Sequence, residues 1–101
     1  MNERTDIQEK CERYARDQKA LVFRLKIHGK RDFPDTTFFL ENGATLIIEF
    51  KTPKGNLREN QQLLIETLRS YNQNVFVICD VPTFRRIFDS YNEKWGYEKT
   101  E

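Results

Sequence analysis

The sequence has 101 residues, of which 33% are charged, and its formal net charge is +1. This length fits one domain with a single core and little apolar surface to spare. The near-neutral charge excludes a strongly basic protein that coats DNA, but it allows a local basic rim. No apolar run approaches a membrane span, and the polar N-terminus is not typical of a signal peptide.

Residues 3–18 predict a helix, because Ile7, Cys11, Tyr14 and Ala15 share one stripe while charged residues cover the rest. Cys79, the second cysteine, ends an apolar run, and the two cysteines have no spacing typical of a metal site. Both are interpreted as reduced core thiols. Because reduced thiols are typical of the cytosol, we expect a cytoplasmic protein.

Residues 21–27 alternate apolar and polar side chains, which predicts the first strand. The loop that follows carries two adjacent cations, Lys30 and Arg31, and leads directly to Asp35. Cations of this kind contact phosphates and position a nucleic acid without reading its sequence. Lys30 and Arg31 are therefore candidate DNA-binding residues, with an ordinary polar loop as the alternative.

A β-hairpin is predicted where Glu41-Asn42-Gly43 separates two β-rich runs, residues 36–40 and 44–50. The register of this hairpin decides whether two carboxylates meet. A two-residue Asn-Gly loop would place Asp35 and Glu49 on opposite faces of the sheet, because strand side chains alternate.

The competing geometry is a three-residue loop closed by Gly43 in the left-handed region. It pairs Leu40 with Ala44, and Asp35 then lies directly across from Glu49. Cross-strand neighbours have Cβ atoms about 5 Å apart, a separation at which two carboxylates can share one cation. We predict the three-residue loop.

A metal site is the interpretation of this pair, because two close carboxylates repel each other unless a positive charge lies between them. Mg²⁺ binds one or two carboxylates together with waters and phosphate oxygens. Lys51 is predicted on the same face, where it would orient or deprotonate the attacking water or hold the attacked phosphate. An activated water, a Lewis acid and a cation are the parts that phosphodiester hydrolysis needs.

Taken singly, these residues have ordinary explanations. An Asp after a Pro is common in turns, and a Glu-x-Lys pair on a strand is often solvated. Glu49, however, interrupts the apolar run Leu46-Ile47-Ile48 and is followed by Phe50. A charge in a strand that should be buried on both faces needs a reason.

Residues 58–71 predict an amphipathic helix whose apolar stripe also carries Gln61. A buried amide needs hydrogen-bond partners, and Lys51 or a bound water would provide them. An ordinary glutamine at the helix boundary is the alternative. Lys54, in the turn before this helix, would extend the basic rim, and Asn56 is the predicted N-cap.

Residues 74–79 are nearly all apolar and follow the helix after a short connection, which predicts a buried strand parallel to a neighbour. Asp80 is expected to cap a last helix with Pro82 near its start. We predict one domain over residues 1–92.

A polar tail is predicted over residues 93–101. Its two large aromatic residues, Trp95 and Tyr97, would pack on the core by default. A dimer interface and stacking on bases are the alternatives.

Several of these residues together resemble the signature of the PD-(D/E)xK nucleases. They are Pro34-Asp35, Ile48-Glu49-Phe50-Lys51, Thr52-Pro53-Lys54-Gly55, Leu57 and Gln61. More closely, their order and spacing resemble the virus-type replication-repair nuclease (VRR-NUC) group, whose small stand-alone members occur in phages. The similarity spans roughly residues 3–88. It implies an α/β fold with a restriction-endonuclease-like core: a helix, a three-stranded meander, a helix, a strand and a C-terminal helix, with a mixed central sheet.

The resemblance also implies an Mg²⁺- or Mn²⁺-dependent endonuclease from a phage or bacterial cell. Its expected substrate is branched DNA such as four-way (Holliday) junctions, and its expected state is a homodimer. Neither an organic cofactor nor a membrane partner is expected. The alternative is a non-catalytic DNA-binding or protein-interaction module on the same fold, which is expected to have lost some of the site residues.

Family knowledge implies a role for each site residue. Asp35 and Glu49 would bind the metal, with the main-chain carbonyl of Phe50 as a further ligand. Lys51 would act on water or phosphate, and Gln61 would support the site.

The first helix departs from the family pattern. The family places a metal-supporting Glu two or three residues before the isoleucine that corresponds to Ile7, but Arg4 stands three residues before Ile7 here. Glu3 on the buried stripe and Glu12 on its flank are the remaining candidates. A solvated Glu3 that stabilises the helix dipole is the alternative.

Overall fold

The computed structural model describes residues 2–29 and 32–98, with only the backbone described for residues 94–98. In chain order the elements are α1 (Glu3–Asp17), β1 (Leu21–Phe23), β2 (Thr36–Phe39), β3 (Thr45–Phe50), α2 (Glu59–Ser70), β4 (Val75–Ile78) and α3 (Val81–Glu98). This α/β order of helix, three-stranded meander, helix, strand and helix confirms the predicted fold class. In the described part of the chain, every helix is too short or too polar to cross a membrane.

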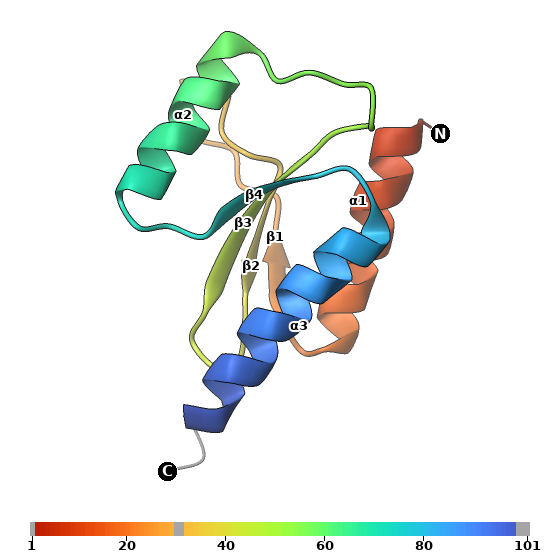
Figure 1. Ribbon diagram of the computed structural model, residues 1–101, viewed down its shortest axis with the longest axis vertical. Helices are drawn as coiled ribbons and strands as arrows, with labels where there is room; N and C mark the ends of the chain where they lie inside the picture. Colours follow the sequence, from red (N-terminus) through yellow and green to blue (C-terminus); the bar gives the residue numbers. More distant parts are fainter. Residues whose placement is uncertain (1, 30–31, 99–101) are drawn as a thin grey trace.

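The four strands form one mixed sheet in the order β1-β2-β3-β4. The first three strands are antiparallel neighbours, and β4 pairs in parallel with β3. The parallel pairing confirms the predicted crossover, which α2 provides. Helices α1 and α3 cover one face of the sheet, and α2 lies on the other (Figure 1).

The main core lies between the sheet and the helices α1 and α3. Its largest fully buried apolar side chains are Phe38, Phe50, Phe84, Phe88, Leu46, Ile48 and Ile78. Burying a side chain of this size stabilises the fold by about 1.5–3 kcal/mol. A smaller cluster of Ile47, Ile65 and Val75 fixes α2 on the opposite face.

Helix α1 packs through the stripe that the sequence predicts. The Asn2 side chain caps its first turn by accepting a hydrogen bond of 2.7 Å from the Thr5 N–H. Ile7 and Cys11 are buried, and burial raises the pKa of the Cys11 thiol to about 12. Cys11 is therefore an inert core thiol, whereas Cys79 is half-buried, and neither forms a disulfide.

The hairpin between β2 and β3 has the predicted three-residue loop. The Leu40 N–H donates to the Ala44 carbonyl over 2.8 Å, and the Gly43 N–H donates to the Leu40 carbonyl over 3.0 Å. Gly43 adopts a φ of +98°, which a residue without a Cβ tolerates. The pairing of Thr36 with Ile48 sets Asp35 opposite Glu49, and this register is confirmed.

Asn42 at the tip of this hairpin connects it to the last helix. Its amide nitrogen donates to the main-chain carbonyls of Tyr91 and Asn92, over 3.2 and 2.9 Å. Its side-chain oxygen accepts from the Ala44 N–H over 2.9 Å. The turn is therefore held both by its own geometry and by α3.

Strand β1 is shorter than predicted, because it ends at Phe23 rather than at Ile27. Its last ladder pair is Phe23 with Thr37, one residue from the start of β2 at Thr36. Residues 24–26 leave the sheet and form part of a wall beside Asp35.

The C-terminal part of the chain differs from the prediction in two places. Strand β4 is an edge strand with a neighbour on one side only, and Val77 is 37% exposed rather than buried. Helix α3 continues to Glu98, through most of the segment predicted as a tail. The side chains of Trp95 and Tyr97 lie outside the part that the structure describes.

Candidate active site

Asp35 and Glu49 enter the site from neighbouring strands. Asp35 immediately precedes β2, and Glu49 occupies the facing position near the end of β3. One carboxylate oxygen of Asp35 accepts a 2.8 Å hydrogen bond from the Phe50 N–H and lies 3.1 Å from the Arg4 guanidinium. These contacts orient Asp35 at the open end of the sheet.

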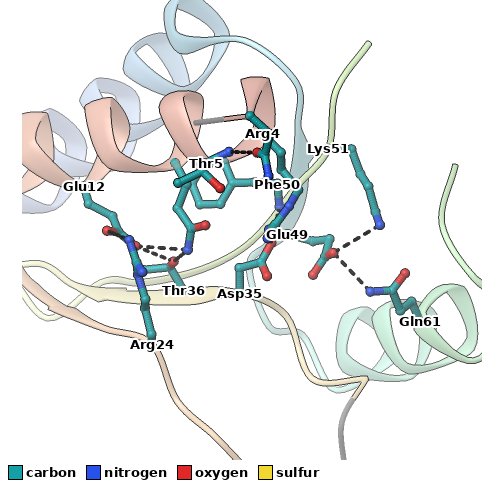
Figure 2. Close-up of polar contacts among 12 residues, drawn as sticks. Arg4, Thr5, Glu12, Arg24, Asp35, Thr36, Glu49, Phe50, Lys51 and Gln61 are labelled. Carbon is teal, nitrogen blue, oxygen red and sulfur yellow. Dashed lines mark hydrogen bonds and ion pairs between the residues drawn. The ribbon is translucent and has the colours of Figure 1, made fainter. Parts of the chain in front are cut away.

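Glu49 is only 3% exposed and is surrounded by donors. Its Oε2 lies 3.7 Å from the Lys51 ammonium group and accepts a 3.1 Å hydrogen bond from the Gln61 side chain. Figure 2 shows Lys51 and Gln61 converging on this carboxylate from two directions, with Asp35 on its other side. The structure thus brings all four predicted side chains together.

The pKa of Glu49 is raised from 4.5 to about 7, first by burial and next by the nearby charge of Asp35. Lys51 and Arg4 act in the opposite sense but do not offset these effects. Near neutral pH a large fraction of Glu49 is therefore protonated. An added cation next to both carboxylates would favour the ionised form.

The Phe50 main chain lies opposite Pro34 in the hairpin ladder. Along an antiparallel ladder, every second pair of facing residues is hydrogen-bonded. Leu40 and Ala44 form such a pair, and so by the register Phe50 and residue 34 would form one as well. The Phe50 N–H donates instead to Asp35. Pro34 has no N–H, so within the described part of β2 the ladder supplies no donor to the Phe50 carbonyl.

Gln61 is buried at the third position of α2. Its Oε1 accepts from the Arg58 N–H over 3.0 Å, and its nitrogen donates to Glu49, so both ends of the amide are bonded. The expectation of Lys51 as the partner of Gln61 is therefore wrong. Arg58 rather than Asn56 is the N-cap residue, and its guanidinium bonds Asp32 over 2.7 Å.

The first helix contributes a cation to the site where a carboxylate was considered. Glu3 is exposed, as expected for an acidic residue at a helix start, and Arg4 reaches Asp35. Sequence reasoning placed Arg4 at the position of the family's Glu but did not predict this contact. The docking angle of α1, which no local pattern encodes, determines it.

Glu12, a candidate metal-supporting residue in the sequence, is paired with Arg24. It is almost fully buried, and its two oxygens accept hydrogen bonds of 2.9 and 2.7 Å from Arg24 and one of 2.8 Å from Thr36. Burial alone would raise the pKa of Glu12, but these hydrogen bonds outweigh it and leave the pKa below its usual value. Gln8 completes this network.

The predicted basic rim is described only in part. Lys54 is exposed beyond the end of β3, where a phosphate can reach it. Lys30 and Arg31 lie outside the residues that the structure describes. Their role in DNA binding stays a prediction.

The residues present fit a hard divalent ion. Within residues 2–29 and 32–98, no group of three or more His, Cys, Asp or Glu residues could hold a metal. Mg²⁺, however, needs only one or two carboxylates, because waters and substrate oxygens complete its shell. Asp35, Glu49 and the Phe50 carbonyl are oxygen donors of the kind it prefers.

The fold and this constellation together define a nuclease-type α/β domain. The sequence model of the VRR-NUC domain family matches residues 4–81, and the chain belongs to this family of DNA-processing nuclease domains. A solved structure described as a VRR_NUC domain is similar to the chain, with a TM-score of 0.83 and 21% sequence identity. The similarity covers 90% of this chain and 99% of the other. A search of curated proteins finds no match.

Proposed function

We propose that this protein is a metal-dependent endonuclease that hydrolyses DNA phosphodiesters, with a preference for branched DNA. The observation that carries the proposal is the meeting of Asp35 and Glu49 on facing strand positions, with Lys51 at 3.7 Å from Glu49. Glu49 is buried and Asp35 is half-buried, and two carboxylates this close gain from a cation bound to both. Family membership supports the same activity.

Asp35, Glu49 and the Phe50 carbonyl would hold Mg²⁺ or Mn²⁺. The ion would supply Lewis-acid activation of the water and of the phosphate. The raised pKa of Glu49 supports this assignment, because ionisation of this buried group gains most from a neighbouring positive charge.

The chain's own residues would carry the other tasks of hydrolysis. Lys51 is held near the scissile position by Glu49, where its ammonium group can stabilise the charge that develops on the phosphate. Gln61 fixes the rotamer of Glu49 and is itself fixed by the Arg58 N–H. Lys54 would contact a flanking phosphate and so align the strand.

The direct test incubates the full chain with a four-way junction, a plain duplex and a single strand. We expect strand cuts near the branch point when Mn²⁺ is present, fewer cuts in the duplex, and none with EDTA. Glu49→Ala should lose the cutting. Glu66→Ala, which removes an exposed carboxylate from α2, should keep it.

Two outcomes would contradict the proposal. Tight binding of the junction without metal-dependent cutting would favour the non-catalytic DNA-binding module. Equal cutting of the junction and the duplex would remove the preference for branched DNA but keep the nuclease.

We further propose that the protein acts as a homodimer. Strands β1 and β2 expose an apolar patch of Leu21, Phe23 and Phe39 on the sheet face that α2 only partly covers. The rings of Phe23 and Phe39 pack edge to face at 6.0 Å, so the patch is continuous. A second copy of the chain is a suitable cover, because a net charge of +1 opposes self-association only weakly.

Sedimentation tests the homodimer. We expect a dimer at micromolar concentration and a monomer for Leu21→Lys, which places a charge in the patch. Leu63→Lys is the matched control, because Leu63 is 54% exposed on α2 but lies outside the patch. A wild-type monomer would overturn the homodimer and leave the nuclease assignment intact.

A further inference from the structure

A pocket of about 720 Å³ opens beside Asp35, and its described lining includes neither Lys51 nor Gln61. Arg4 and Gln8 of α1 form one wall, and Arg24 to Ile27 together with Gly29 form another. Its volume falls within the range of about 300–1,000 Å³ that is usual for small-ligand sites. Of the four side chains of the nuclease site proposed above, Asp35 alone belongs to the described lining of this pocket.

The lining of the pocket is partly cationic and partly apolar. Arg4, Arg24 and Lys26 contribute positive charge, and Asp35 is the one carboxylate in the described lining. The apolar part consists of Leu25, Ile27, Phe33 and Pro34. A nucleotide combines these two requirements, because its phosphate needs cations and its base needs an apolar surface.

Arg24 is held in position by a carboxylate that lies behind it. Glu12 is 1% exposed and binds the Nε and Nη2 atoms of Arg24, while Thr36 and Gln8 also donate to it. An arginine has five N–H donors, so this pairing leaves donors for a ligand. Arginine forks of this kind match phosphate oxygens.

The partners of this ion pair differ in exposure. Glu12 is buried, but the Arg24 side chain is 52% exposed, so its guanidinium stays accessible at the pocket wall. What the Glu12 network adds is a fixed direction for the Arg24 guanidinium. A fixed guanidinium at the wall of a pocket is what recognition of an anion requires.

We propose that this pocket receives one unpaired nucleotide of the DNA, next to the phosphate that is cut. Its phosphate would bind Arg24 and Lys26. Its base would pack on Leu25, Ile27 and Phe33. This proposal rests on the proposed function, since Asp35 belongs to both sites, and it supplies a physical basis for the selection of branched DNA, where unpaired nucleotides occur.

The apolar lining favours an unpaired base over a paired one. Leu25, Ile27 and Phe33 offer surfaces on which the face of a base can pack. In a duplex the faces of each base are covered by its stacked neighbours. A base that has left the stack exposes its faces and can pack there.

The test measures binding without metal, so that it does not depend on cutting. Two duplexes of equal length, one with a single unpaired 2-aminopurine nucleotide and one fully paired, are titrated with the full chain in EDTA. We expect tighter binding of the first, by about tenfold. The fluorescence of the 2-aminopurine should rise on binding, as the base leaves the stack.

Two exposed positions provide the variants. Lys26→Ala should weaken binding of the unpaired duplex about tenfold and lower its salt slope by about one phosphate contact. Leu25→Ala should reduce the fluorescence rise. Lys10→Ala is the control, because Lys10 is exposed on α1 and paired with Asp6 outside the pocket. Arg24 is not replaced, because its loss would leave Glu12 buried without its cation.

Two outcomes would overturn the proposal, and a third would separate it from the nuclease. If Lys26→Ala lowered the binding affinity equally for both duplexes, Lys26 would be a general phosphate contact. Binding of a free deoxynucleoside monophosphate as tight as that of the unpaired duplex would make the pocket a site for free nucleotides. Preferential binding of the unpaired duplex, in a chain that cuts nothing with Mn²⁺, would support the pocket and refute only the nuclease.

Discussion

Glu49→Gln is expected to stabilise the metal-free protein above pH 7 and to abolish metal-dependent cutting. In the native state Glu49 keeps its proton up to about pH 7, whereas in the unfolded chain it loses the proton near pH 4.5. The native state therefore binds more protons in this window, and its free energy of unfolding falls as the pH rises through it. The difference corresponds to about 3 kcal/mol.

Glutamine has the same shape but does not ionise, so Glu49→Gln avoids this loss. The gain over wild type should be near zero at pH 4.5 and approach its full value above pH 7. Denaturant unfolding in EDTA across this range measures it. Glu66→Gln, an exposed carboxylate on α2, should show no such trend. A gain that is independent of pH would contradict the assignment.

The same variant separates the role of the metal from that of the fold. Mn²⁺ at a hundred times its dissociation constant should stabilise the wild type by about 2.7 kcal/mol. Glu49→Gln should show little of this stabilisation, because an amide replaces a charged ligand. Equal stabilisation of both proteins by Mn²⁺ would place the ion elsewhere.

Lys51→Met is expected to lower the rate of cutting by about 10²- to 10⁴-fold, the usual contribution of one positioned charge or proton donor. Its ammonium group lies beside Glu49, and its side chain is only 19% exposed. Methionine retains most of the apolar stem, so the fold should persist. Single-turnover cleavage with saturating protein and Mn²⁺ measures the chemical step.

The control for this prediction is Lys10→Met, which removes an exposed lysine from α1. Stabilisation by Mn²⁺ should survive in Lys51→Met well above pH 7, because loss of the lysine raises the pKa of Glu49 but leaves its carboxyl group in place. If cutting and metal stabilisation are lost together, Lys51 acts only by holding Glu49 in its charged form. A decrease in rate of less than tenfold would also exclude the proposed role.

The central pair of the site could be predicted because its geometry is local. Asn42 and Gly43 encode the turn, the turn fixes the register, and the register sets Asp35 across from Glu49. Strand alternation then places Lys51 on the same face. Each of these steps spans only a few residues, and therefore a sequence pattern can carry it.

Contacts between distant elements could not be predicted in this way. The pairing of Arg4 with Asp35 and that of Arg24 with Glu12 depend on how α1 docks on the sheet. The apolar–polar alternation of residues 21–27 continues past Phe23, so it does not mark where β1 ends. The pocket lies where α1, the segment after β1 and the segment before β2 meet, so no local sequence pattern predicts it.

The side chain at the tip of the hairpin has a consequence for the order in which the protein matures. Asn42 is bonded to main-chain carbonyls that lie 49 and 50 residues further along the chain. During synthesis on the ribosome, the turn can form from its own residues, but its attachment to α3 has to wait until the last helix has emerged. The tip of the hairpin is therefore expected to be among the last parts of the fold to become fixed.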